Sequence, residues 1–416
     1  MLKSIQYEVL DKILIFYFQL LLSLMHKYFL LIFILFTTVI SNAQTVQGKV
    51  VDEMSGEPIP FVSIGVIGTN NTTVTNDAGE FILKNIILPA KLRYSHVSYL
   101  LIEDEISSYN NLFVKLNPAA INLKTVTVDP YRGQRLVKAA LEKTKEFEKN
   151  IFYGNAFYRQ LTTINEKPSQ IYELFYDLKF SVSNVSAWIA KQSRFAQSND
   201  GISFSMSNQS YLTFLLAGNL FEERKAGKFV TLKNLKDYEI SVERYIEQKD
   251  QDIAVVSCKY KGKRKEFYVN SIYYIGVEDS KIYRLENSIF NLPLKVNVTS
   301  KIPPTVTTIA TFNGTNNPIP VLQNISTKLY LNLSTRGRSI TPVISSMLTI
   351  YQLDKNLSTQ KFTELNRKVQ DKAIVESIEY NPEFWKNNPI VKQTALEDAF
   401  IKMMESKSAF GTMIVP

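Results

Sequence analysis

Side chains that commonly carry out catalysis are scarce in this chain. Its 416 residues include two histidines and one cysteine. His26 stands in an apolar N-terminal segment, whereas His96 stands in a strand-like stretch between Ser95 and Val97. A serine–histidine–carboxylate triad would have to use one of these imidazoles, and a zinc site rich in histidine has too few of them. We therefore expect no catalytic and no metal-binding residues, and we interpret His96 as a packed or edge residue of a strand.

Other catalytic patterns are equally weak. The sequence contains neither a phosphate-binding glycine loop that ends in Lys-Ser/Thr nor a dinucleotide fingerprint, so we expect no cofactor. Acidic neighbours occur at Glu222-Glu223 and at Asp250 and Asp252. Two opposed carboxylates could hydrolyse a glycosidic bond, although adjacent acids on a surface are commonly just solvated. A hydrolase that uses carboxylates alone therefore remains an alternative, and it requires a cleft with two opposed acids.

The single cysteine, Cys258, ends the apolar stretch 253–258, which reads as a strand. One cysteine cannot form an internal disulfide or a thiolate metal cluster. We expect it to be a small buried apolar residue.

Basic residues exceed acidic ones, with 48 Lys and Arg against 39 Asp and Glu, a formal net charge of +9. One run is concentrated, at 259–265, and Gly262 within it predicts a hairpin tip. Its residues Lys261, Lys263, Arg264 and Lys265 could form a patch for anionic lipid or polysaccharide. A solvated turn accounts for the same residues and is the interpretation we prefer. No nucleic-acid module is visible.

The N-terminal segment has the pattern of a secretory signal. A basic start at residues 25–27 precedes an apolar run at 28–40, and Ser41-Asn42-Ala43 follows. The run is shorter than the ~20 residues that span a bilayer. We predict a true start at Met25 and cleavage between Ala43 and Gln44. In the alternative, translation starts at Met1, and the apolar segments 13–24 and 28–40 keep the protein anchored in the membrane.

Residues 46–128 have the strand density of an all-β sandwich. Val62, Ile64 and Val66 alternate with small residues, the period of a strand with one buried face. The clusters 52–58 and 77–79 predict tight turns, because Asp accepts backbone hydrogen bonds and Gly adopts positive φ. About seven short strands fit into roughly 85 residues.

This stretch resembles the carboxypeptidase-regulatory-like (transthyretin-like) domain. The resemblance rests on Gly48-Lys49-Val50-Val51-Asp52, Gly56-Glu57-Pro58, Gly68-Thr69, Asn76-Asp77-Ala78-Gly79-Glu80-Phe81 and Ser98-Tyr99. Asn76 replaces the usual Thr, and Ser98 replaces the usual Gly. The resemblance implies a seven-stranded sandwich at the N-terminus of a Gram-negative envelope protein. It implies no peptidase activity, because the His-Glu pair and further His of the zinc carboxypeptidases are absent.

The region behind the sandwich reads as one amphipathic helix, at 133–150, and a long series of strands. Separate strands are expected at 264–269 and 274–278, and a second helix at 211–221. The run 237–289 resembles the meanders with which periplasmic lipoprotein-carrier proteins build an open half-barrel over an apolar cavity. A plain antiparallel sheet packed on helices is the slightly preferred alternative. In the tail, Thr394 is a predicted N-cap with Glu397 at the capping-box position, and Leu396, Phe400, Met403 and Met404 are expected on one buried face.

Together these patterns predict a mainly β protein with a few helices. The predicted parts are an N-terminal extension with signal peptide (1–43), the sandwich (44–128), an antiparallel, possibly half-barrel, β-rich domain with packed helices (129–380) and a helical tail (381–416). The expected function is that of an exported, non-enzymatic envelope protein, periplasmic or associated with the outer membrane. Its sandwich would dock, and its β-rich region would bind an envelope protein or an apolar ligand. The alternative is a periplasmic carrier that holds lipid or lipoprotein in an apolar half-barrel cavity.

Overall fold

The computed structural model describes residues 45–122, 129–198, 229–263, 265–293, 299–313, 319–335, 338–365 and 371–411, together with Leu21, Leu22, Met25, Ser210 and Thr213. The chain divides into two compact units, Met1–Gln44 and Thr45–Pro416. All strands and helices named below belong to the second unit. The predicted cleavage residues, Ala43 and Gln44, and the predicted strand 125–128 lie outside the described residues.

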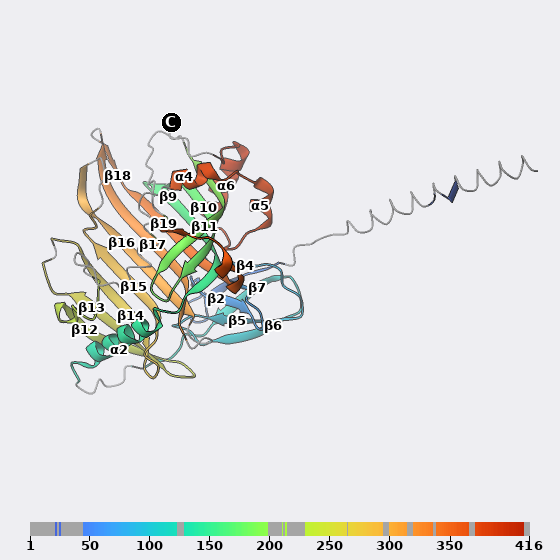
Figure 1. Ribbon diagram of the computed structural model, residues 1–416. Coiled ribbons are helices and arrows are strands. Elements are labelled where there is room, and N and C mark those ends of the chain that lie inside the picture. The colour runs from blue at the N-terminus through green and yellow to red at the C-terminus, as the bar shows by residue number, and fades with distance from the viewer. Residues whose placement is uncertain are drawn as a thin grey trace, which may run out of the picture. The chain divides into compact units, whose positions relative to one another are not determined.

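The N-terminal part is a sandwich of seven strands in two sheets, as predicted (Figure 1). One sheet has the order β4-β1-β7, with β1 (Val46–Asp52), β4 (Glu80–Leu83) and β7 (Asn111–Leu116). The other has the order β3-β2-β5-β6, with β2 (Ser63–Val66), β3 (Thr72–Val74), β5 (Ala90–Ser95) and β6 (Ile102–Ile106). Strands β1 and β7 run parallel, and the other pairs are antiparallel. The inward residues, among them Val50, Ile64 and Phe81, form one core.

Both predicted turns of the sandwich form for the expected reasons. The Asp52 carboxylate accepts hydrogen bonds from the backbone N–H groups of Met54 and Ser55, at 2.8 Å each. Gly79 has φ +71°, and a Cβ there would lie 2.4 Å from the carbonyl oxygen of Val50. Only glycine fits at that position without moving the neighbouring strand.

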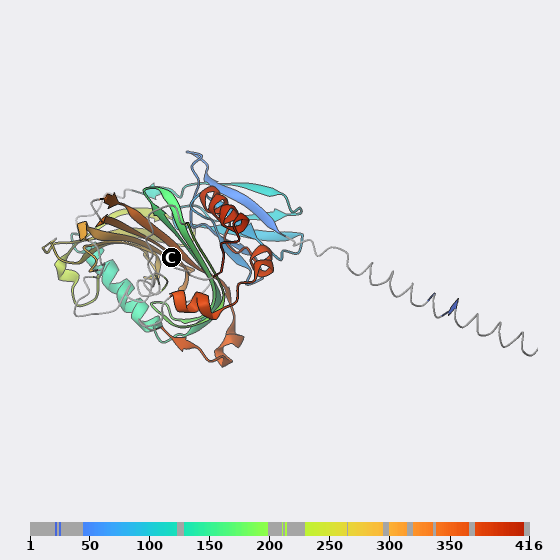
Figure 2. The same ribbon diagram turned by 90° about the horizontal axis from the view of Figure 1, so that it is seen from above.

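The second part is built on one antiparallel sheet, whose order is β20-β11-β10-β9-β19-β17-β16-β15-β14-β13-β12-β8, with β18 added to β17. Its edges, β20 and β8, do not pair with each other, so the sheet is open, and it curves (Figures 1 and 2). Its strands are β8 (Ile121–Asn122), β9 (Phe152–Ile164), β10 (Lys167–Phe180), β11 (Val185–Gln197), β12 (Tyr238–Glu247), β13 (Asp252–Tyr260), β14 (Tyr268–Gly276), β15 (Ile282–Phe290), β16 (Thr299–Asn313), β17 (Val321–Thr335), β18 (Arg338–Ile340), β19 (Pro342–Leu353) and β20 (Thr363–Glu364).

The expectation of two strands at 264–269 and 274–278 was wrong. A single strand, β14, pairs with β13 from Ser271 to Gly276. The predicted gap between the two strands, 270–273, lies inside β14. The Asn270 side chain accepts a hydrogen bond from the Tyr260 backbone, 2.9 Å away, and so extends the pairing.

Four helices are described in this unit: α2 (Arg132–Phe147), α4 (Asp371–Ser377), α5 (Pro382–Asn387) and α6 (Ala395–Ser406), with 3-10 turns at Leu235–Asp237 and Lys355–Thr359. The capping box of Thr394 and Glu397 at the start of α6 is confirmed. The expected buried face of α6 is only partly right, because Leu396 is 47% exposed and Ile401 is buried instead. Of the predicted helix 211–221 only Thr213 is described, and it is helical.

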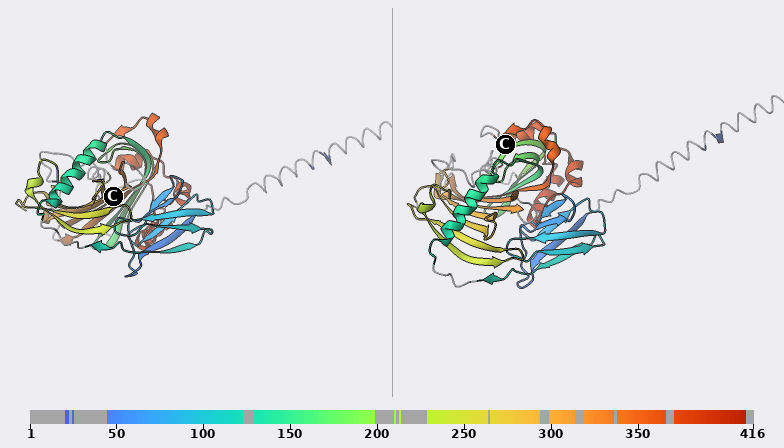
Figure 3. Two further views of the ribbon diagram at one scale, coloured as in Figure 1. Left: turned by 90° about the horizontal axis from the view of Figure 1, so that it is seen from below. Right: turned by 60° about the horizontal axis from the view of Figure 1, so that its bottom comes forward.

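The two faces of the large sheet are covered by different parts of the chain. Helices α2 and α4 contribute to the hydrophobic core on one face, here called the inner face (Figure 3). On the outer face, α6 packs on Leu161 and Ile171. Val74 of the sandwich and Trp385 of α5 pack there on Phe157 and Phe175. The side chains of the inner face are therefore separated from the sandwich by the sheet itself.

Candidate functional site

A row of polar side chains crosses the inner face at one level. Six neighbouring strands each place one uncharged polar residue in direct register with the next. These residues, the polar belt, are Ser271, Asn287, Thr308, Thr327, Ser346 and Gln160. All are buried, and the most exposed, Ser346, is 4% exposed. Register alone creates the belt, because a shift of one residue in any strand would turn its polar side chain to the other face.

Hydrogen bonds connect parts of the belt. The Ser271 hydroxyl donates to the Asn287 side-chain oxygen at 2.7 Å, and the Asn287 amide reaches the Thr308 hydroxyl at 3.4 Å. Ser346 and Thr213 share a hydrogen bond of 3.0 Å between their hydroxyls. Between these two groups, the hydroxyl of Thr327 is fully buried and has no partner among the described residues.

Apolar rows flank the belt on both sides, two residues away along the strands, except on β9, where Thr162 stands beside the first row. The first apolar band consists of Val269, Ile289, Val306, Leu329 and Ile344. The second consists of Tyr273, Leu285, Ala310, Ile325, Leu348 and Tyr158. A neutral polar row between two apolar rows suits an amphipathic chain without a charge at its centre, because an unpaired ion would be costly to bury there.

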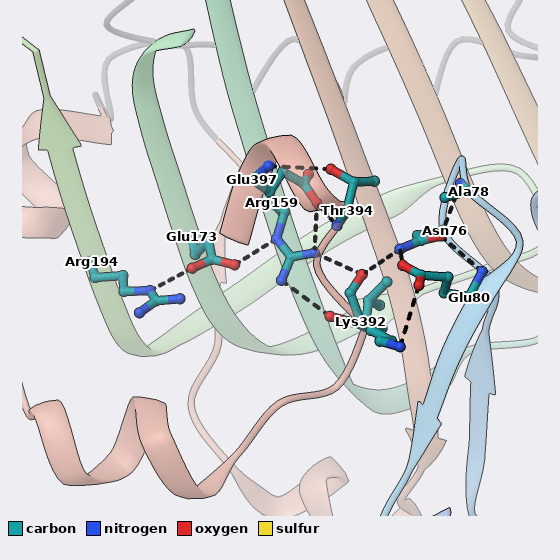
Figure 4. A network of polar contacts seen from close by, with 10 residues as sticks. Asn76, Ala78, Glu80, Arg159, Glu173, Arg194, Lys392, Thr394 and Glu397 are labelled. Atoms are coloured by element: carbon teal, nitrogen blue, oxygen red, sulfur yellow. Dashed lines mark hydrogen bonds and ion pairs between the residues drawn. The ribbon is translucent and has the colours of Figure 1, made fainter. Parts of the chain in front are cut away.

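The buried charged side chains of the strands lie on the outer face, whereas Asp371 of α4 is buried against the inner face. Glu173 of β10 binds two arginines on its neighbouring strands (Figure 4). Its carboxylate oxygens lie 2.6 Å from Nε of Arg159 and 2.5 Å from Nε of Arg194. The three side chains are almost completely buried, at 1–5% exposure. Such a triad is destabilised strongly if one member is removed, since an uncompensated charge then remains inside.

The tail of the chain completes this charge network. Arg159 Nη2 donates to the carbonyl oxygen of Val391 at 3.1 Å, and its Nη1 lies 3.4 Å from a carboxylate oxygen of Glu397. The same Glu397 carboxylate accepts the Thr394 N–H in the capping box. The guanidinium of Arg194 lies over the ring of Trp385, 4.5 Å from its centroid. The network therefore fixes both α5 and α6 on the sheet.

The sandwich joins the network through the segment between α5 and α6. Thr73 donates to the carbonyl oxygen of Ile390 at 2.9 Å. Asn76 donates to the carbonyl oxygen of Lys392 at 3.0 Å (Figure 4). The Lys392 ammonium lies 3.4 Å from the Glu80 carboxylate. Three consecutive carbonyls, at residues 390–392, are thus held by the sandwich and by Arg159 together.

The charges in this network have shifted pKa values. Burial alone would raise the pKa of Glu173, but Arg194 and Arg159 outweigh it and lower the pKa. Burial alone would lower the pKa of Arg159, but Glu397 and Glu173 raise it. Both groups therefore keep their charges at neutral pH. Their charges stabilise the fold by pairing, and neither group serves as a proton donor or acceptor.

His96 lies at a second contact between the sandwich and the sheet. Its Nε2 is 3.2 Å from Nη1 of Arg284 on β15, and its ring meets Tyr99 edge-on at 5.2 Å. Burial, followed by the charge of Arg284, lowers the pKa of His96 to about 3. The imidazole is therefore neutral at physiological pH. The interpretation of His96 as a packed residue agrees with this position, although it lies just past the end of β5.

The basic residues predicted as a patch lie in the β13–β14 turn. Lys261, Lys263 and Lys265 are exposed, whereas Arg264 lies outside the described residues. Cys258 is buried, and burial raises the pKa of its thiol far above the ordinary value. In the described part of the chain, no group of three or more His, Cys, Asp or Glu side chains is placed to hold a metal ion. No helix within the described ranges is both long and apolar enough to cross a membrane.

Sequence reasoning did not identify the charge network or the polar belt. The sequence contains one indication of the network: charged residues interrupt strands that are otherwise rich in aromatic and aliphatic residues, at Arg159, Glu173 and Arg194. Charges inside such strands are expected to be paired. The belt left no local signal, since one Ser, Thr, Asn or Gln per strand is common and the register was not known.

Comparison with known proteins identifies the N-terminal part. Residues 46–128 match the family model of the CarboxypepD_reg-like domain. The sandwich is therefore a CarboxypepD_reg-like domain, and the sequence-based assignment is confirmed. No curated protein matches the chain.

Solved structures show slight similarity to about half of the chain. A LolA superfamily protein from Nitrosomonas europaea is 10% identical, with 55% of this chain and 97% of that chain covered and a TM-score of 0.19. A DUF1329 family protein from Desulfovibrio piger is 9% identical, with 55% and 95% covered and a TM-score of 0.21. Lipovitellin is 9% identical, with 54% and 28% covered and a TM-score of 0.25.

Proposed function

We propose that this protein is an exported, non-enzymatic binding protein of the cell envelope, which holds an apolar or lipidic ligand on the inner face of its large sheet. The observation that supports this proposal is the layout of that face, in which a neutral polar belt has one apolar band on each side. A core that only had to be stable would gain from apolar residues in the belt, because burying polar groups costs free energy unless they are fully hydrogen-bonded.

The CarboxypepD_reg-like domain would serve as the docking module. Its contacts with the large sheet include the apolar packing of Val74 on Phe157 and Phe175. They also include hydrogen bonds, in which Gln248 donates to the carbonyl oxygens of Val97 and Tyr99 at 3.1 and 3.0 Å. The exposed turn with Lys261, Lys263 and Lys265 would add attraction to anionic surfaces, as a secondary contribution. Export rests on the signal-like pattern at residues 25–44. N-terminal sequencing of secreted material tests it, and an intact Met1 would refute cleavage.

Hydrolysis by paired carboxylates is less well supported. Asp250 and Asp252 lie at the turn between β12 and β13, where Asp252 pairs across the ladder with Glu247. Asp250 is exposed and Asp252 is half-buried, whereas hydrolysis by this mechanism needs two opposed acids in a cleft. Glu222 and Glu223 lie outside the described residues.

Lipid co-purification tests the proposed function. The full chain is expressed in a Gram-negative host, and its mass under native conditions is compared with its mass after delipidation. We expect a mass difference and lipid in the organic extract. Ala310→Phe, which enlarges a buried side chain of the second apolar band, should reduce the bound lipid several-fold, and thermal unfolding verifies that the variant is folded. Ile309→Phe, the neighbour on the opposite face of β16, is the matched control. Equal masses before and after delipidation would refute the proposal.

A further inference from the structure

We propose that the free side of the sandwich binds an extended cationic segment of a partner protein, which adds a strand to the edge of β7. This inference rests on the docking role proposed for the CarboxypepD_reg-like domain, and it specifies the surface and the chemistry of the partner. It does not require a ligand on the inner face of the large sheet.

Each sheet of the sandwich has one end that contacts the rest of the chain and one end that is free. The strands β3 and β4 stand at the first kind of end. From β3, Thr72 donates to the carbonyl oxygen of Tyr351 at 3.0 Å, and on β4 Glu80 lies 3.4 Å from the ammonium of Lys392. At the other ends, β6 and β7 pair only with β5 and β1 among the described strands. The short connection 107–110 joins them, so both free edges lie on the same side of the sandwich.

Strand β7 has the features of an edge that accepts another strand. An edge strand presents unpaired N–H and C=O groups, and proteins commonly protect such edges with charged residues, proline or a bulge. The centre of β7 carries Phe113 instead, and this aromatic side chain is 64% exposed. A peptide that pairs with such an edge gains backbone hydrogen bonds, and the exposed ring supplies a side-chain anchor.

The charge of the partner follows from the acids of β6. Asp104 stands opposite Leu92 in the ladder, and therefore on the face that the sandwich buries, yet it is exposed. Asp104 and Glu105 have no ion pair among the described residues, whereas two cations of β5 bind Glu103. The free side of the sandwich thus offers two carboxylates to a cationic partner.

A buried hydroxyl lies near Asp104. Tyr94 is 0% exposed, and its hydroxyl has no hydrogen-bond partner among the described residues. The ladder makes Tyr94 the diagonal neighbour of Asp104 on the same face, at about 7–8 Å. Burial raises the pKa of Tyr94, and the charge of Asp104 raises it further. A phenolic oxygen accepts as well as donates, so a cation bound to Asp104 can also donate to Tyr94.

The distance between the two sheets suits a lysine or arginine in the added strand. Inward side chains of that strand would lie next to Leu112 and Val114, on the core side of β7. Packed sheets lie about 10 Å apart. A lysine or arginine there covers the apolar groups with its aliphatic stem and extends its charge toward β6. Outward side chains would lie beside Phe113, where an apolar residue is favoured. The expected segment therefore alternates cationic and apolar residues.

The same charges argue against a second copy of this chain as the occupant. Antiparallel pairing of two β7 strands about a twofold axis would also bring the two β6 edges together. Asp104 and Glu105 would then approach the same acids of the other copy, and like charges repel. A cationic partner is the occupant that charge complementarity favours.

The test uses full-length protein and three fluorescently labelled peptides of equal length. The first peptide alternates lysine with valine and phenylalanine, and the second has glutamate in place of lysine. The third has the side chains of the first, but every backbone nitrogen is methylated, which removes the donors that a strand needs. Fluorescence anisotropy gives the dissociation constants.

Two variants of the free side are compared with matched controls. Phe113→Thr removes the exposed ring of β7, and Tyr131→Thr removes an equally exposed ring outside the sandwich. Asp104→Asn removes the charge on β6, and Asp250→Asn removes an exposed charge at the β12–β13 turn. Thermal unfolding verifies that each variant is folded.

We expect wild-type protein to bind the first peptide more tightly than the other two. Phe113→Thr should weaken this binding about five- to thirty-fold, because an aromatic anchor is lost. Asp104→Asn should weaken it about two- to fivefold, the effect of one exposed ion pair, and high salt should reduce the difference. The two control variants should bind as wild type does.

Three results would overturn the inference. Unchanged binding to Phe113→Thr would mean that the peptide lies elsewhere. Equal binding of the methylated peptide would show that charge attracts it without strand addition. A wild-type dimer in sedimentation that Phe113→Thr dissociates would assign the edge to a second copy.

Bound lipid, measured on the same samples, separates this inference from the proposed function. None of the four substitutions lies on the inner face, so we expect the same lipid content in every variant. A protein that contains no lipid but binds the first peptide as expected would refute the lipid ligand and support the docking edge.

Discussion

Replacement of His96 should remove a distinct part of the acid sensitivity of this protein. In the folded state the pKa of His96 is lowered to about 3, first by burial and second by the charge of Arg284. In the unfolded chain the imidazole has a pKa of about 6.5. Between these values the unfolded state binds a proton that the folded state does not. The stabilisation is therefore fully present above pH 6.5 and is lost as the pH falls toward 3.

The magnitude follows from that interval. Each pH unit below 6.5 removes at most about 1.4 kcal/mol. At pH 4.5 wild-type protein should have lost about 2.7 kcal/mol that a His96→Gln variant does not lose. The assay is urea unfolding of both proteins at pH 7.5 and 4.5. Both proteins contain the same carboxylates, so the effect of carboxylate titration cancels when the stability of His96→Gln is subtracted from that of wild type.

Two outcomes decide the reasoning about His96. If the stability difference between wild type and His96→Gln is the same at both pH values, to within about 0.5 kcal/mol, His96 titrates normally and is not buried against Arg284. An Arg284→Met variant separates the two causes. Because burial is the larger one, most of the pH dependence should remain in that variant.

Three further substitutions test other parts of the fold by urea unfolding. Glu173→Gln leaves two buried guanidinium groups without their carboxylate and should cost about 3–5 kcal/mol; a loss below 1 kcal/mol would mean that the arginines find other partners. Since the pKa of Glu173 is lowered, its contribution is present above the unfolded pKa of about 4.3 and is lost as the pH falls through the folded value. Thr394→Ala removes the N-cap of α6 and should lower the free energy of unfolding by about 0.5–2 kcal/mol. An unchanged urea midpoint would contradict this prediction. Gly79→Ala should lower the free energy of unfolding clearly more than the comparison variant Gly56→Ala, because both residues have positive φ but, of the two, only Gly79 lacks space for a Cβ. Equal decreases would show that the backbone conformation alone determines the effect.

Local patterns in the sequence were sufficient for most elements of the fold. The apolar stretch 253–258 located β13, and the amphipathic pattern at 133–150 located α2, each to within a few residues. The turns at Asp52 and Gly79 were predicted because their chemistry depends on residues a few positions apart. Local patterns misled at β14, where the predicted gap at 270–273 is part of one strand that its neighbours extend by pairing.

The arrangement of the candidate site could not be predicted in the same way. Thr327 and Ser346 are neighbours only because β17 and β19 pair in one particular register. Arg159 and Glu173 lie opposite each other for the same reason on β9 and β10. Register depends on the packing of whole faces against helices and against the sandwich. A single sequence contains each of these residues but not their adjacency.

The strands of the sheet bury charged side chains on the outer face and neutral polar side chains on the inner face, and the proposed function rests on this difference. Charged groups must be buried with fixed partners, and on the outer face Glu173 and the tail supply them to Arg159 and Arg194. Any ligand there would have to replace several of these contacts at once. Neutral hydroxyls tolerate an exchange of partners at a cost of about 1 kcal/mol each. A ligand that comes and goes is therefore compatible with the inner face, while the outer face keeps the sandwich and the tail in place.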